Sequence, residues 1–130
     1  MIGSYGLELD PAKLSEEEKD LIRREIKEYR KLCPIIKEGD FYRLSHTPEL
    51  GCAFAVSQDG REGVLIAVRR LYHGNPKDHY VKFKGLDEKG RYSVEGKEYS
   101  GSMLMKAGLL LPFTYSEDFE AVRLKVKRLD

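Results

Sequence analysis

The chain has 130 residues, enough for one ordinary domain with a single core but well short of the roughly 250 residues that a complete (β/α)8 barrel needs. Its 23 Lys and Arg against 22 Asp and Glu give a formal net charge of +1, and no basic stripe interleaved with aromatic residues suits a nucleic-acid backbone. No apolar run approaches a membrane span and the start lacks the pattern of a signal peptide, so we expect no nucleic-acid partner, no membrane partner and a cytoplasmic location.

The first segment is predicted to be a short strand. Tyr5, Leu7 and Leu9 alternate with other residues over 2–10, and the run ends at an Asp-Pro pair. A single strand followed by a single helix cannot bury its apolar side chains alone. The N-terminal part therefore looks like a piece of a larger parallel structure.

The next segment carries the signals of a helix. Ser15 and Glu18 have the spacing of a capping box, and apolar residues recur at helical spacing over 21–32. Pro34 is expected to kink or end the helix. If one more turn follows, Gly39 is expected to supply a left-handed stop.

After Gly39 the apolar residues alternate with period two, which is typical of β-strands. A helical turn is expected over 102–107, and 109–112 is expected to be a buried crossing, because Pro112 donates no hydrogen bond. The predicted strands are Phe41–Leu44, Cys52–Ser57, Val64–Tyr72, His79–Lys84, Arg91–Glu95, Glu98–Tyr99 and Ala121–Leu129. Short strands with frequent turns favour an antiparallel sandwich or barrel.

Several motifs resemble the end of bacterial α-galactosidases of glycoside hydrolase family 36. The N-terminal series is Gly-Ser-Tyr-Gly-Leu-Glu-Leu-Asp at 3–10, Leu-Ser-Glu-Glu-Glu at 14–18 and Gly-Asp-Phe-Tyr-Arg-Leu at 39–44. The likeness continues through Lys-Gly-Leu-Asp at 84–87, Arg-Tyr-Ser-Val at 91–94 and the stretch 99–109. It covers nearly the whole chain in matching order and spacing.

The resemblance implies a mainly β fold: an antiparallel β-sandwich over 39–130, preceded by a strand-helix unit over 1–38 that is left over from a (β/α)8 barrel. It also implies a parent enzyme that retains configuration and removes terminal α-1,6-linked galactose from melibiose and the raffinose series. The two catalytic aspartates of the family lie on earlier barrel strands that this chain does not contain. The expected partners are the rest of the catalytic barrel, the α-galactoside substrate through the parent enzyme, and further copies in a homo-oligomer.

Retaining hydrolysis needs two carboxyl groups about 5 to 5.5 Å apart, and the sequence suggests no such pair. Asp10 is the best functional candidate, because it closes a predicted barrel strand at the end where barrel active sites lie; a turn-forming Asp before a proline is the favoured interpretation. Glu16, Glu17 and Glu18 compensate the helix dipole, and Asp40 is expected to cap a turn. No residue is assigned a catalytic, cofactor-binding or metal-binding role.

The remaining reactive residues are also interpreted as structural. His46, His73 and His79 lack metal-ligand spacing, and Cys33 and Cys52 are predicted to be buried free thiols. The Ser-Gly-Ser run at 100–102 lacks the surroundings of a nucleophilic serine, and 85–90 lacks the pattern of a phosphate loop.

The leading hypothesis is a non-catalytic accessory domain that stabilises the barrel or its subunit contacts. An independent carbohydrate-binding module is the alternative, and a protein-interaction sandwich is a third. Sugar platforms use exposed aromatic side chains, and Tyr72, Tyr80 and Tyr115 beside turns are the candidates. The aromatic residues predicted to lie in the core are Phe41, Phe54, Phe83 and Tyr92.

Overall fold

The computed structural model describes residues 6–45, 47–71, 74, 77–114 and 116–130. A short 3-10 turn, η1 (Pro11–Lys13), precedes the helix α1 (Glu16–Glu38). The strands are β1 (Asp40–Arg43), β2 (Leu50–Val56), β3 (Glu62–Arg69), β4 (Tyr80–Val81), β5 (Arg91–Val94), β6 (Lys97–Ser100), β7 (Leu109–Leu110) and β8 (Glu120–Arg128), and a π-helical turn, η2 (Met103–Ala107), lies between β6 and β7. The prediction of a mainly antiparallel β fold with one N-terminal helix is confirmed.

The helix α1 begins at the predicted capping box. The Ser15 hydroxyl accepts a hydrogen bond from the Glu18 amide at 3.2 Å, and the Glu18 carboxylate accepts one from the Ser15 amide at 2.8 Å. The hydrogen bond from the Ser15 amide, helped by the Ser15 side chain, lowers the pKa of the Glu18 carboxyl below its ordinary value. Pro34 does not end the helix, which continues to Glu38; the carbonyl of Arg30, which loses its donor, belongs to an exposed residue that water can reach.

Gly39 ends the helix for a reason other than the predicted one. Its φ is −82°, so it is not left-handed. A β-carbon at this position would lie 2.5 Å from the carbonyl oxygen of Ile35 and would also overlap the carbonyl oxygen of Val56. Glycine is therefore needed because the end of α1 approaches β2 so closely.

The strand predicted over residues 2–10 is wrong for 6–10, which belong to no strand; residues 1–5 lie outside the described part. A strand needs the backbone of a neighbour for its hydrogen bonds, and the described strands pair with one another without this segment. Residues 6–14 instead lie along the first turns of α1, where Leu7, Leu9 and Leu14 line a shallow groove with Ile22.

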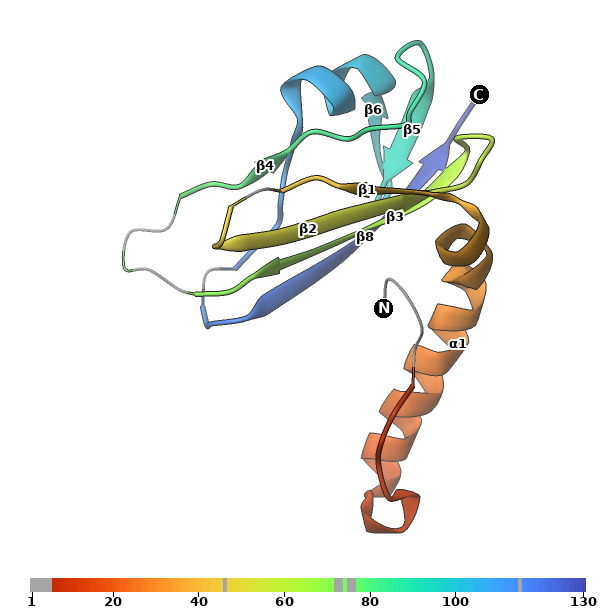
Figure 1. Ribbon diagram of the computed structural model, residues 1–130, viewed down its shortest axis with the longest axis vertical. Coiled ribbons are helices and arrows are strands. Elements are labelled where there is room, and N and C mark those ends of the chain that lie inside the picture. Colours follow the sequence, from red (N-terminus) through yellow and green to blue (C-terminus); the bar gives the residue numbers. More distant parts are fainter. Residues whose placement is uncertain (1–5, 46, 72–73, 75–76, 115) are drawn as a thin grey trace.

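The main sheet has six strands in the order β1-β2-β3-β8-β5-β6, and every pairing is antiparallel (Figure 1). Predicted strands account for all six, with ends shifted by at most three residues. The run predicted over 79–84 shortens to β4, which pairs with β7 in a separate two-stranded sheet. The buried crossing predicted over 109–112 is confirmed for Leu109 and Leu111, whereas Leu110 is exposed.

The core lies between the inner face of the main sheet and the segment that carries β4, η2 and β7. Phe54 and Phe83 meet edge to face in it, with ring centroids 5.0 Å apart. The alternation predicted for the last strand is confirmed, because Leu124 and Val126 are buried while Lys125 is exposed.

A second, small core lies on the outer face of the sheet, where Leu32 of α1 packs on Ala55 and Val64. Figure 1 shows α1 crossing the strands steeply, with its N-terminal half projecting away from the sheet. The apolar contacts of the helix with the sheet thus come from its C-terminal turns.

Candidate functional site

Asp10, the best carboxylate candidate from the sequence, caps the turn η1. Its Oδ1 accepts a hydrogen bond from the Ala12 amide at 3.0 Å, and its Oδ2 lies 3.9 Å from the Lys13 ammonium group. This is the geometry of an aspartate that initiates a turn before a proline.

The other acidic candidates also lie at element ends. Glu16 pairs with Lys19 at 2.8 Å on the first turns of α1, and Asp40 is the exposed first residue of β1. Among the residues described, no group of three or more His, Cys, Asp or Glu side chains is arranged to hold a metal ion.

Of the histidine and serine candidates, His79 and Ser100 can be placed, and each makes a local contact. The His79 ring meets Phe113 edge to face with centroids 5.9 Å apart, whereas His46 and His73 lie outside the described residues. The Ser100 hydroxyl accepts a hydrogen bond from the Met103 amide at 3.1 Å, so it caps η2. The loop 85–90 supports the neighbouring Tyr92, whose hydroxyl accepts a hydrogen bond from the Asp87 amide at 2.9 Å.

The prediction of buried aromatic side chains is confirmed for Phe54, Phe83 and Tyr92. It is wrong for Phe41, whose side chain lies on the outer face of β1 and is 55% exposed. Tyr80 is 60% exposed on β4, and the other two tyrosine candidates, 72 and 115, lie outside the described residues.

Both cysteines are free, as predicted. Cys52 is buried in the main core, and burial raises the pKa of its thiol to about 12, which makes it unreactive near neutral pH. Cys33 is only half-buried on α1, so the prediction of a buried thiol is wrong for it.

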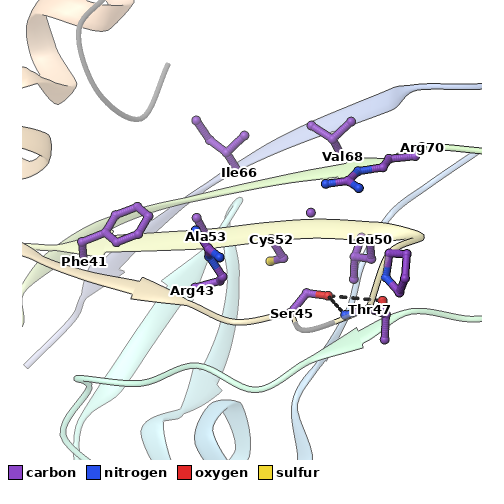
Figure 2. Close-up of a pocket in the computed structure, with 12 residues that line it drawn as sticks. Phe41, Arg43, Ser45, Thr47, Leu50, Cys52, Ala53, Ile66, Val68 and Arg70 are labelled. Atoms are coloured by element: carbon purple, nitrogen blue, oxygen red, sulfur yellow. Dashed lines mark hydrogen bonds between the residues drawn. The ribbon is translucent and has the colours of Figure 1, made fainter.

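An open groove of about 720 Å³ lies on the outer face of β1, β2 and β3 and is here called the outer groove (Figure 2). Gly51 and Ala53 form its floor, because β2 carries only small side chains on this face. Figure 2 shows Ile66 and Val68 of β3 and the ring of Phe41 standing up around that floor. The other lining residues used below are Ser45, Thr47 and the two rim arginines, Arg43 and Arg70.

The rim of the outer groove is basic. Arg43 and Arg70 are both exposed, and across the described part of the chain neither has an ion pair or a side-chain hydrogen bond. The nearby hydroxyls of Ser45 and Thr47 lie 3.4 Å from each other. The groove therefore offers an apolar floor with two available guanidinium groups.

The sequence motifs did not single out this groove, although a signal was present. The runs 52–56 and 64–68 are apolar at almost every position rather than at every second one. Strands of this kind are typically covered on both faces. The pattern predicts that the second face of these strands is also covered, but it does not say what covers it or where.

One buried arginine also escaped sequence analysis. Arg69, at the end of β3, is 2% exposed and donates hydrogen bonds to the carbonyl oxygens of Leu71 at 2.9 Å and Glu117 at 2.5 Å. It also meets the Glu120 carboxylate at 3.2 Å, and that carboxylate accepts a hydrogen bond from the Thr114 amide. The cluster ties the loop before β8 to the end of β3.

Two ion pairs hold α1 against the sheet. Glu25 meets Arg123 at 3.2 Å, and Glu28 meets Lys125 one turn later. The Lys125 ammonium group, as the largest cause, lowers the pKa of Glu28 from its ordinary value of 4.5.

We expect this contact to make stability depend on pH. Because the folded-state pKa of Glu28 lies below its unfolded value, its contribution is present above the unfolded pKa and is lost as the pH falls through the folded pKa. Urea unfolding should find Glu28→Gln about 0.5 kcal/mol less stable than the parent near neutral pH, and the difference should vanish once the pH has fallen below the folded-state pKa of Glu28. Glu49→Gln removes an exposed carboxylate that lies outside the helix and has no ion pair in the described part of the chain, and it is the control. A constant difference for Glu28→Gln at all pH values would contradict the expectation.

Within the part of the chain that the structure describes, no helix is both long enough and apolar enough to cross a membrane. Solved structures of α-galactosidases contain the fold of this chain. It superimposes on the galactosidase domain of the α-galactosidase/sucrose kinase AgaSK with a TM-score of 0.86 and 38% identity, covering 93% of this chain and 17% of that one. The α-galactosidase AgaA of Geobacillus stearothermophilus gives a TM-score of 0.87 at 32% identity over 94% of this chain and 17% of that one.

Residues 52–125 match the model of the glycosyl hydrolase family 36 C-terminal domain, and the chain belongs to this family. By sequence it is 38% identical to AgaSK of Mediterraneibacter gnavus over 99% of this chain and 14% of that protein. It is 36% identical to AgaA over 98% of this chain and 18% of that protein. The chain thus spans less than a fifth of the length of these relatives.

Proposed function

We propose that this chain is the C-terminal accessory domain of an α-galactosidase that hydrolyses terminal α-1,6-galactosides such as melibiose and the raffinose series. In this proposal the catalytic residues lie outside the chain, and its role is to stabilise the catalytic barrel or its subunit contacts. The family match supports the parent activity, as does the similarity to AgaA, of which one variant was solved in complex with raffinose.

The observation that carries the stabilising role is the exposed apolar side of α1. The N-terminal half of the helix projects past the sheet (Figure 1), and Leu21 in this half is 53% exposed. Leu7 and Leu9, which lie along the same turns, are 43% and 51% exposed. An apolar helix side with little to pack on indicates a contact with the rest of a larger protein.

The same reasoning supports the proposed division of the chain. Residues 1–38 would be the remnant of the barrel's last strand and helix, and 39–130 a sandwich with a reduced second layer. Outside its parent, a barrel strand has no neighbours to pair with, which fits the absence of a strand over 6–10.

A first test concerns the site of catalysis. The purified chain should not hydrolyse a nitrophenyl α-galactoside. Turnover that is abolished by Asp10→Asn would place catalysis in this chain and overturn the proposal.

A second test concerns the helix. In the full-length enzyme, Leu21→Asp should shorten the half-life of thermal inactivation by about tenfold while kcat at low temperature is unchanged, because burying a carboxylate at the contact costs a few kcal/mol. Lys27→Asp, on the polar face of α1, introduces the same group and should have little effect. Equal half-lives for the two variants would contradict a contact through this side of the helix.

The carbohydrate-binding alternative is favoured by the exposed aromatic side chains of Phe41, Tyr80 and Phe119. Calorimetric titration of the chain with raffinose distinguishes the two functions. The accessory-domain proposal expects no heat beyond dilution.

A further inference from the structure

The strands β2 and β3 are apolar on both faces, but only part of their outer face is covered. Leu32 of α1 packs on Ala55 and Val64, at one end of the strands. The next outward residues, Ala53 and its partner Ile66, line the outer groove and are only partly buried. Because strands that are apolar on both faces are normally covered on both, the outer groove is the uncovered continuation of the surface on which α1 packs.

The uncovered stretch has the dimensions of a helix. Ala53 and Gly51 lie two and four residues along β2 from Ala55, which is about 7 to 13 Å at the rise of a strand. Packed helices lie about 8 to 10 Å apart. Since α1 crosses the strands steeply, a helix beside it would cross the same strands over this stretch (Figure 1).

The groove also specifies the chemistry of its occupant. A floor of Gly51 and Ala53 between the side chains of Ile66 and Phe41 leaves room for large aliphatic side chains (Figure 2). The guanidinium groups at the rim would meet carboxylates, because arginine pairs with them through two parallel hydrogen bonds.

We propose that the outer groove seats a second helix, side by side with α1, that comes from the catalytic part of the enzyme outside this chain. This helix presents large aliphatic side chains to the floor and Asp or Glu residues to Arg43 and Arg70. The inference rests on the proposed function, since it presumes a catalytic part. It adds the sheet face as a docking surface separate from the projecting half of α1.

Two other occupants fit the groove less well. A sugar would need several polar groups that converge on its hydroxyls, whereas the floor is carbon. A second copy paired by a two-fold axis through the groove would bring arginines against arginines, which is repulsive.

The test is thiol labelling at chosen positions. Val68→Cys places a thiol in the groove, and Lys127→Cys places one on the same face of the sheet but outside it. Both are labelled with a maleimide in the 130-residue chain and in the full-length enzyme, and read by peptide mass spectrometry. We expect labelling at 68 to slow by about tenfold or more in the full-length enzyme, as for a buried interface, and labelling at 127 to stay unchanged.

A third thiol separates this inference from the proposed function. Leu21→Cys reports on the helix contact. Protection at 21 without protection at 68 overturns the groove inference and leaves the accessory role standing, whereas protection at neither position overturns both. If Val68→Cys does not fold, Ala53→Cys on the floor replaces it.

The alternatives are also decided by labelling. If raffinose slows the labelling of Val68→Cys in the 130-residue chain, the groove is a sugar site and the inference is wrong. If labelling of that chain slows as its concentration rises, a second copy fills the groove and the inference is likewise wrong. The seated helix is supported if neither raffinose nor concentration changes the labelling rate of the 130-residue chain, and if position 68 is protected in the full-length enzyme.

Discussion

Replacing Arg69 with methionine should lower the free energy of unfolding by about 3 kcal/mol. The substitution keeps much of the buried volume but leaves the carbonyl oxygens of Leu71 and Glu117 without their donor. It also removes the ion pair that Arg69 makes with the Glu120 carboxylate, which is only 11% exposed. Urea unfolding followed by circular dichroism measures the change.

The neighbouring residue is a matched control. Arg70 carries the same side chain one position later, but it is exposed, so Arg70→Met should change stability by less than about 0.5 kcal/mol. Similar losses for the two variants would mean that the Arg69 cluster contributes no more than a surface charge. A large loss for Arg69→Met alone supports the cluster as the anchor of the loop before β8.

Arg69 also shows why part of the fold could not be predicted. In the sequence it is a basic residue at the end of an apolar run, like Arg70 beside it. Its burial depends on Glu117 and Glu120, about fifty positions later, which β8 brings beside β3. Local patterns carry no information about such a distant partner.

The helix and the main strands were predictable because their signals are local. The capping box needs only Ser15 and Glu18, and alternation over 122–126 is decided by neighbouring residues. Alternation does not say which face is buried: Tyr42 packs on the core and Phe41 points outward, and the sequence pattern fits either choice.

The candidate site was less predictable than the fold. The resemblance named the family, but its motifs drew attention to carboxylates and tyrosines rather than to a hollow between strands. A groove forms where small residues such as Gly51 lie beside larger side chains on the next strand. Which small and large residues lie side by side is known only once the register of β2 and β3 is known.

The motif over 99–109 has a structural explanation that can be tested. Gly101 lies against the turn at Asp87, and a β-carbon there would overlap the Asp87 carbonyl oxygen and lie 2.9 Å from its carbon. The turn cannot move freely, because the Asp87 carboxylate accepts hydrogen bonds from the Arg128 side chain at 2.9 Å and from the Lys89 amide at 3.0 Å. Gly101→Ala should therefore destabilise the chain by about 3 kcal/mol, through overpacking against backbone that is held in place.

The comparison that isolates this effect is Gly51→Ala. Its added β-carbon meets nothing closer than the Val68 carbonyl oxygen at 3.9 Å, so the same methyl group should change the free energy of unfolding by less than about 0.5 kcal/mol. Thermal and urea unfolding of both variants decide the matter. If Gly101→Ala unfolds like the parent, the motif glycine is not explained by packing against the Asp87 turn; if it alone is strongly destabilised, the motif marks a close backbone contact that fixes the end of the sheet.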